Sequence, residues 1–271
     1  MRHLPVLAAL TLLAACSSPK HQAQQTSAAQ AAPSPLAPPS APSSAPAIEG
    51  RKVGVTNALI DFDYSYPVQA AAIPKLKAWL DADIAKQKQD LTEGAEGDRE
   101  DAKKNGFPAH QYSHTTAWKV VTEIPGWLSL SAERWEYTGG AHGNPWSESL
   151  LWDKAADTKR DPLDLFMSKA ALSKAIRAPF CAQIDQQREE KRGEPVNRNS
   201  GDEFDQCIDP VESTVILGSS DHQHFDRVGV LVGPYAAGPY VEGEYEATLP
   251  VTPAVLAAVK PEYRQYFALG R

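Results

Sequence analysis

The chain has 271 residues, 42% of them hydrophobic, with 27 Lys and Arg against 34 Asp and Glu and a formal net charge of −7. An acidic chain is a poor candidate for binding nucleic acid or anionic lipid surfaces, so we expect no nucleic-acid partner. The length allows one large domain or two closely packed ones.

The first fifty residues read as an export signal and a tether. A short basic start is followed by an apolar run over 4–15, which is the length of a signal peptide and too short to span a membrane. The run ends in Leu13-Ala14-Ala15-Cys16, which resembles the bacterial lipobox. We therefore expect a signal peptide over 1–15, lipidation of Cys16, and a disordered Ala/Pro/Ser tether within 16–50. Ser17 resembles the sorting pattern for the outer membrane, which predicts a cell-envelope lipoprotein facing the periplasm and held to the membrane by its lipid.

The remaining residues, 51–271, alternate between strand and helix patterns. Alternating side chains predict strands, and apolar residues three and four apart predict helices. We expect an α+β fold in which antiparallel sheets pack with a few helices, as one composite domain of two subdomains over 51–135 and 136–271. The expected strands are 53–67, 111–124, 127–137, 146–152, 213–217, 227–232 and 242–249; the expected helices are 73–92, one starting near Lys169, and 252–259.

Two features leave the course of the expected helices undecided. The charged, glycine-broken run 93–105 is either a continuation of the helix before it or a solvated loop. Pro179 lies inside the helix that starts near Lys169, after a turn over 161–166, and is expected to kink that helix or divide it in two.

The run from Trp135 to Trp146 combines three glycines, a proline and a histidine between two strand patterns, and we interpret it as a structural crossing at the centre of the domain. A second Gly/Pro-rich run covers 233–240. His142 either makes a functional contact or fixes its turn by bonding a backbone carbonyl. The aromatic residues of the two runs form either a binding surface or core. The candidate binding residues are Tyr137, Gly139, Gly140, His142, Trp146, Tyr235 and Tyr240, with Trp135 beside them.

With Cys16 lipidated, Cys181 and Cys207 remain as an even pair in an exported chain. A disulfide is the leading interpretation. It would hold the polar segment 182–206 in place.

Metal and enzyme motifs are weak or missing. The pairs Asp61/Asp63 and His110/His114 lie in strand patterns without further ligands, so we expect no metal there. His222 and His224 can share one strand face, and a site with His142 is the alternative left open. No nucleophile elbow, phosphate-binding glycine loop or His-Glu-x-x-His motif occurs. We predict no catalytic residue and no cofactor, and we lean against an enzyme.

The run Tyr137-Thr138-Gly139-Gly140-Ala141-His142, the later Asp164-Leu165-Phe166, and Pro234 to Gly238 before a strand ending in Leu249-Pro250 resemble an extracytoplasmic domain family. This family includes the non-catalytic domain of PdaC-type peptidoglycan deacetylases and the ectodomain of RsiV-type anti-sigma factors. The resemblance implies an α+β domain of the bacterial envelope. RsiV-type members bind lysozyme, and the domain beside the PdaC-type deacetylase is a candidate for holding cell-wall substrate.

Three hypotheses follow. The first is a lipid-anchored binding module for peptidoglycan, or for a peptidoglycan-acting protein such as lysozyme, without catalysis of its own. The alternative is a metal-dependent envelope hydrolase that uses His142 with His222 or His224. A purely structural envelope role also stays open.

Overall fold

A computed structural model describes residues 49–271 of the chain. The predicted signal peptide, Cys16 and nearly all of the predicted tether lie outside the described residues. Within 49–271, no helix combines the length and the apolar character that crossing a membrane requires.

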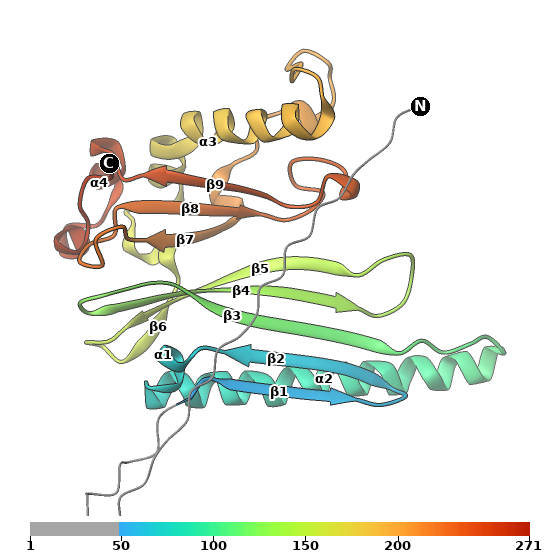
Figure 1. Ribbon diagram of the computed structural model, residues 1–271. Coiled ribbons are helices and arrows are strands. Elements are labelled where there is room, and N and C mark those ends of the chain that lie inside the picture. Colours follow the sequence, from blue (N-terminus) through green and yellow to red (C-terminus); the bar gives the residue numbers. More distant parts are fainter. Residues whose placement is uncertain (1–48) are drawn as a thin grey trace, which may run out of the picture. The chain divides into compact units, whose positions relative to one another are not determined.

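The larger of two sheets has six strands in the order of the chain (Figure 1). All neighbours are antiparallel except β2 and β3, which are parallel because helix α2 connects them across the sheet. The predicted strands over 111–124, 127–137 and 146–152 are confirmed. The strands are β1 (Arg51–Thr56), β2 (Ile60–Tyr66), β3 (Tyr112–Ile124), β4 (Trp127–Tyr137), β5 (Asn144–Asp153) and β6 (Thr158–Arg160).

The single strand predicted over 53–67 is wrong, because a tight turn divides it into β1 and β2. The side chain of Asn57 accepts hydrogen bonds from the backbone N–H groups of Leu59 (2.7 Å) and Ile60 (3.0 Å). An asparagine that bonds the backbone two and three residues on stabilises a turn and ends a strand.

Helix α2 (Pro74–Asn105) follows the short helix α1 (Val68–Ala71) and covers one face of the large sheet (Figure 1). The run 93–105 continues this helix, so the loop alternative is excluded. Its buried residues, Ala95 and Ala102, extend the apolar stripe that begins with larger side chains. The core on this face contains Phe62, Tyr64, Leu76, Leu80, Trp118, Leu128, Leu130, Leu150 and Trp152.

The smaller sheet has three antiparallel strands, β7 (Thr214–Gly218), β8 (Arg227–Val232) and β9 (Tyr245–Pro250), as predicted to within three residues. Helix α3 (Lys169–Arg192) packs against it, and the short helix α4 (Pro253–Ala258) confirms the last predicted helix. Of the two outcomes expected at Pro179, a kink or a division, the division is wrong, because α3 continues through this residue. Pro179 is exposed, so water can satisfy the carbonyl that loses its donor, while Ile176, Phe180 and Ile184 hold both halves on the core.

The two sheets share one core. Ile124, Trp127 and Leu151 of the large sheet pack in the same cluster as β7, β8, β9 and α3. The hydroxyl of Thr214 on β7 also donates to the backbone oxygen of Ser147 on β5 (2.8 Å). The boundary expected at 135/136 falls inside β4, and the change from one sheet to the other comes after β6.

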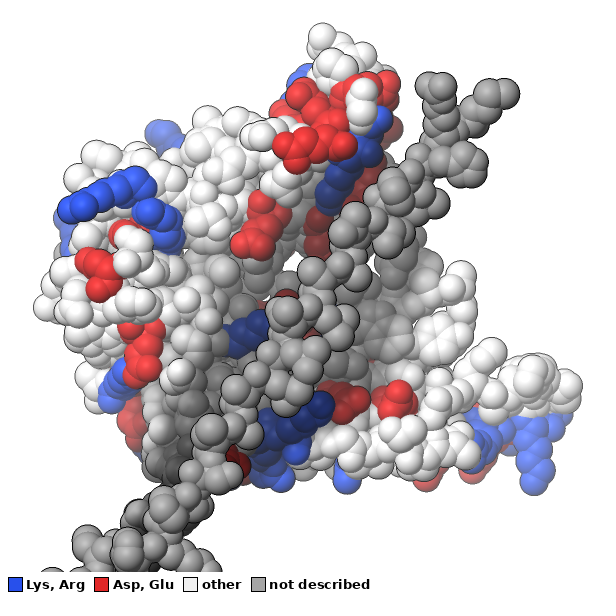
Figure 2. All heavy atoms as spheres, viewed as in Figure 1, with Lys and Arg blue, Asp and Glu red and all other residues white. Residues whose placement is uncertain are grey.

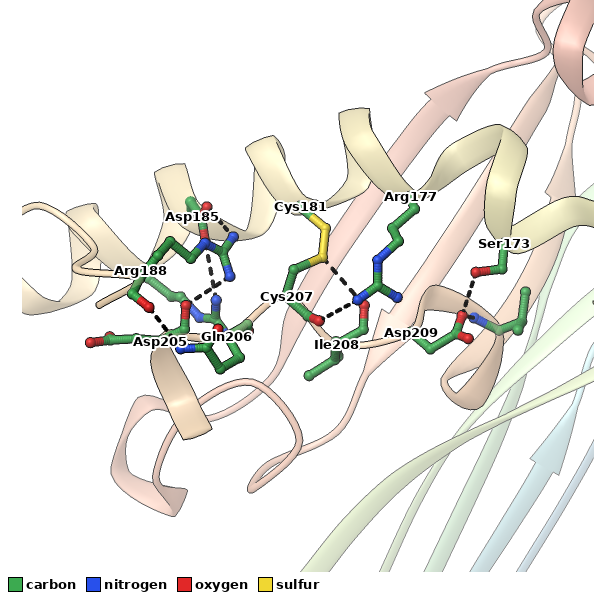
Figure 3. Close-up of a disulfide and its surroundings, with 12 residues drawn as sticks. Ser173, Arg177, Cys181, Asp185, Arg188, Asp205, Gln206, Cys207, Ile208 and Asp209 are labelled. Atoms are coloured by element: carbon green, nitrogen blue, oxygen red, sulfur yellow. Dashed lines mark hydrogen bonds and ion pairs between the residues drawn. A yellow bond between two sulfur atoms is a disulfide. The ribbon is translucent and has the colours of Figure 1, made fainter. Parts of the chain in front are cut away.

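The predicted disulfide is confirmed: Cys181 of α3 is bonded to Cys207, with Cα atoms 5.5 Å apart. Figure 3 shows that neighbouring turns of α3 are tied to the same returning segment. Ser173 donates to Asp209 (2.7 Å), and Arg177 donates to the backbone oxygen of Cys207 (2.8 Å). The disulfide is therefore the covalent member of a series of contacts that hold the segment 205–209 along α3.

Helix α3 also covers the outer edge of β9 with side-chain amides. Gln183 donates to the backbone oxygen of Thr248 (3.1 Å) and accepts from its N–H (3.1 Å). Gln187, one turn later, does the same with Glu246, at 2.6 Å and 3.3 Å. These four hydrogen bonds occupy the positions that a further strand would use. We call this arrangement the glutamine ladder.

Candidate functional site

The β4–β5 loop, which carries the Tyr-Thr-Gly-Gly-Ala-His motif, lies at one end of the large sheet (Figure 1). The expected central crossing is therefore a hairpin loop at an end. Gly139 (φ 101°) and Gly140 (φ 93°) adopt conformations that favour glycine. Gly143 lies so close to the indole of Trp135 that an added Cβ would be 2.3 Å from it. The glycines thus let the loop fold back onto Trp135.

His142 joins this loop to the small sheet. Its Nδ1 lies 2.9 Å from the backbone oxygen of Gly143, and its ring stacks on Tyr240 with centroids 3.8 Å apart. The Tyr240 hydroxyl donates to the same oxygen (2.8 Å). Since a carbonyl only accepts, we assign the proton to Nδ1, which leaves Nε2 as an acceptor 3.5 Å from the hydroxyl of Tyr235. The ring therefore fixes the turn and holds the β8–β9 loop against it.

Tyr235 is held in an unfavourable backbone conformation. Its φ is 67°, which costs a residue with a Cβ about 1–3 kcal/mol, and its side chain is 56% exposed. An exposed ring at a strained position contributes little to the core. The strain is more easily explained by a surface role than by packing.

The candidate aromatic residues divide between the two faces of the sheet. Trp135 and Tyr137 alternate onto the face toward the small sheet, with rings 6.3 Å apart and nearly parallel at 16°. Trp146 pairs with Arg134 and packs against His114 on the face covered by α2. The structure therefore brings Trp135, Tyr137, His142, Tyr235 and Tyr240 together and leaves Trp146 out. We call these five residues the aromatic corner.

Beside the aromatic corner, the gap between the sheets contains two adjoining hollows. One, of about 250 Å³, lies between Trp135 and Pro145 on one side and Glu244 on the other. The second, of about 360 Å³, continues inward past Ser131 and Ser147 to Val232 and Tyr245. Both are lined by Glu133 and Glu244, so together they form one inter-sheet cleft.

A buried polar group that the sequence analysis missed lies under the other face. Arg134 is 4% exposed and forms ion pairs with Asp83 of α2 (2.9 Å) and Glu148 of β5 (2.8 Å). Burial opposes the ionisation of Asp83, but the hydrogen bond from Tyr64 and the charge of Arg134 outweigh it and hold the pKa of Asp83 below its usual value. The signal was present: Arg134 occupies an apolar position in the alternation of Leu128, Leu130 and Ala132.

His114, on the same face, makes the domain sensitive to acid. Burial lowers the pKa of His114 below its usual value of 6.5, although Glu136 (3.3 Å) opposes this. Phe62 stacks on its ring and Trp146 packs against it edge to face, while Thr116, Arg134 and Asp83 are the other polar neighbours. The unfolded chain therefore binds a proton more readily than the folded one. The stability that His114 contributes is complete above pH 6.5 and is lost as the pH falls through its folded pKa.

We predict that His114→Gln flattens the fall in unfolding free energy between pH 7 and pH 5. Urea unfolding at several pH values measures this slope. His110→Gln is the control, since His110 is exposed. An unchanged slope in His114→Gln would contradict the prediction.

The histidines of the alternative hydrolase hypothesis are not brought together. His222 and His224 lie in the β7–β8 loop, whereas His142 contacts the β8–β9 loop at the opposite end of β8, about 20 Å away for a six-residue strand. His224 pairs with Asp221 in its own turn. Over residues 49–271, no group of three or more His, Cys, Asp or Glu side chains is arranged to hold a metal ion. The geometry gives the metal-dependent hydrolase no support.

Charge is distributed over the surface without a basic face in the view of Figure 2. Acidic side chains gather at the C-terminal end of α3 and the loop after it, and basic side chains at the C-terminal end of α2, where Lys103 and Lys104 occupy the last turn. The absence of a basic face in this view agrees with the net negative charge of the chain.

Residues 54–145, from β1 through the glycine motif, match the family model described as Deacetylase PdaC. The resemblance to the PdaC-type domain family is thereby confirmed for this part of the chain. No curated protein matches the sequence.

Two solved structures are similar to this chain over most of its length. One is a DUF3298 family protein from Pseudomonas aeruginosa PAO1, with 17% identity, a TM-score of 0.46, and coverage of 83% of this chain and 99% of that one. The other is a DUF3298 family member from Bacteroides fragilis NCTC 9343, with 17% identity, a TM-score of 0.48, and coverage of 82% and 93%.

Proposed function

We propose that this protein is a binding module of the bacterial cell envelope that holds peptidoglycan at the aromatic corner and does not itself catalyse a reaction. The observation that carries the proposal is the pair of parallel rings of Trp135 and Tyr137, beside His142 and Tyr235, at the mouth of the inter-sheet cleft. Flat, partly exposed rings next to polar groups are a common way to bind sugars, because the ring faces pack against C–H groups while the polar groups fix orientation.

The family match supports an envelope role. Residues 54–145 match the model described as Deacetylase PdaC, and the resemblance that the sequence suggested is to PdaC-type deacetylases of peptidoglycan, a polymer of the envelope. The N-terminal sequence supports the anchoring part of the proposal. A lipid on Cys16 and the Ala/Pro/Ser segment after it would place the folded part near a membrane, in our proposal the outer membrane facing the periplasm, within reach of the wall.

Co-sedimentation of the purified protein with peptidoglycan sacculi tests the proposal. We expect the protein to pellet with sacculi and Trp135→Ala to weaken this binding about tenfold or more, the usual size of a central aromatic contact. Trp146→Ala is a matched control, because both tryptophans are 36% exposed on adjacent strands but face opposite sides of the sheet. It should retain binding.

Equal losses in the two variants would contradict the aromatic corner as the binding surface. If the protein did not pellet with sacculi and was instead retained by lysozyme, the peptidoglycan proposal would be wrong and a protein partner would replace it.

A further inference from the structure

The smaller hollow of the inter-sheet cleft has a chemical character that narrows its ligand. We propose that it binds an amino sugar with a free ammonium group, as one unit of a glycan strand. This inference rests on the proposed function and names the sugar class that the site prefers.

The hollow is built from both sheets. Trp135 and Glu133 lie two residues apart on β4 and therefore face the same side. Pro145, Ala117 and Thr115 complete the wall on the large sheet, and Glu244 comes from the connection that precedes β9. A sugar placed against the indole thus has one carboxylate beside it and another opposite.

Arg134 and Lys191 are the basic residues among those that line the two hollows. Arg134 lines the smaller hollow but directs its guanidinium to Asp83 and Glu148 on the other face of the sheet. Lys191, in the adjoining hollow, donates to the backbone oxygens of Glu242 (2.8 Å) and Glu244 (2.6 Å) and lies over the ring of Tyr245. Lys191 keeps its charge, but Glu133, Glu244 and Glu246 all line the cleft, so negative charge exceeds positive charge there.

The two carboxylates are accessible. Glu244 is exposed and takes part in none of the ion pairs found within residues 49–271. Glu133 pairs with Lys119, but both side chains are more than half exposed at 68% and 58%, and such surface pairs contribute only about 0–1 kcal/mol. A ligand ammonium can replace Lys119 at little cost.

An ammonium group fits this arrangement better than the other groups of envelope polymers. Two carboxylates repel phosphate and free carboxylate, and an N-acetyl group brings no charge to offset them. An ammonium is attracted to both carboxylates and to the face of the indole. The sugar ring then packs on Trp135, and the hydroxyl groups of Thr115, Ser131 and Ser147 line the path along the cleft.

Calorimetric titration with two matched probes tests this inference: a glucosamine hexamer and an N-acetylglucosamine hexamer. We expect the glucosamine hexamer to bind at least tenfold more tightly to the full chain. Glu244→Gln should remove about tenfold of that affinity, and Glu262→Gln, which removes the same charge from an exposed site elsewhere, should not.

Equal affinities for the two hexamers, or equal effects of Glu244→Gln and Glu262→Gln, would overturn the inference. So would equally tight binding of a trilysine peptide, because the site would then recognise charge without a sugar. Each of these results leaves the proposed function intact if the protein still pellets with sacculi. Failure on sacculi together with tight binding of the glucosamine hexamer would instead remove peptidoglycan as the ligand and keep the amino-sugar site.

Discussion

Replacing Arg188 with methionine is expected to lower the free energy of unfolding by about 3 to 5 kcal/mol, the usual cost of breaking a buried charged network. Arg188 is fully buried, and its guanidinium donates to the backbone oxygens of Ala237 (2.8 Å) and Gln206 (3.0 Å) and to Asp185 (3.0 Å). Methionine fills a similar volume but cannot donate, so the buried carbonyl of Ala237 loses its hydrogen bond and Asp185 and Gln206 lose theirs. The loss is large because Arg188 is the point where α3, the segment 205–209 and the β8–β9 loop meet.

Arg177→Met is the control for this result. Arg177 lies on the same helix and also donates to a backbone oxygen of the returning segment, but its side chain is exposed, so water can replace it. We expect a loss below about 1 kcal/mol. Urea unfolding measures the free energy of unfolding of both variants. Similar losses in the two would contradict the prediction that burial makes Arg188 more important to stability than Arg177.

Removing the disulfide by the double replacement Cys181→Ser and Cys207→Ser is expected to lower the free energy of unfolding by about 3.5 kcal/mol. This value follows from the chain-entropy model for cysteines 26 positions apart in sequence. The folded structure itself should change little, because Ser173, Arg177 and Arg188 still bind the segment 205–209.

Unfolding of the wild-type protein with and without reductant gives an independent measurement of the same quantity. Reductant should destabilise the wild-type protein and leave the double variant unchanged. A loss of less than 1 kcal/mol in both experiments would contradict the prediction. It would mean that the unfolded chain is already compact between the two cysteines, so that the disulfide removes little further entropy from it.

The sequence was sufficient for most of the fold, and the errors have physical causes. Strands such as 127–137 alternate clearly, and the two cysteines left only one pairing within the folded region. The second half of α2 was ambiguous because its buried residues are alanines between glycines and charges, which give a weak apolar period. The β1–β2 turn was missed because it depends on one side chain, Asn57, rather than on a glycine or a proline.

The candidate site was predictable only in part. The glycine motif and the tyrosines of the second Gly/Pro run correctly indicated the β4–β5 and β8–β9 loops, which contact each other. Sequence alone, however, does not give the register of a hairpin with a six-residue loop. Without that register, Trp135 and Trp146 could not be assigned to opposite faces. Glu133 and Glu244 were missed for a different reason: each is an ordinary exposed glutamate in its own segment, and only the packing of one sheet against the other makes them neighbours.

The glutamine ladder has a consequence for how the protein behaves among other unfolded or partly folded chains. An uncovered strand edge is a template on which a foreign segment can add and start aggregation. Here the edge of β9 becomes available only if α3 lifts away, and the disulfide at Cys181, two residues before Gln183, opposes that movement. Oxidation of one cysteine pair thus also protects the solubility of the molecule, because it helps to keep this strand edge covered.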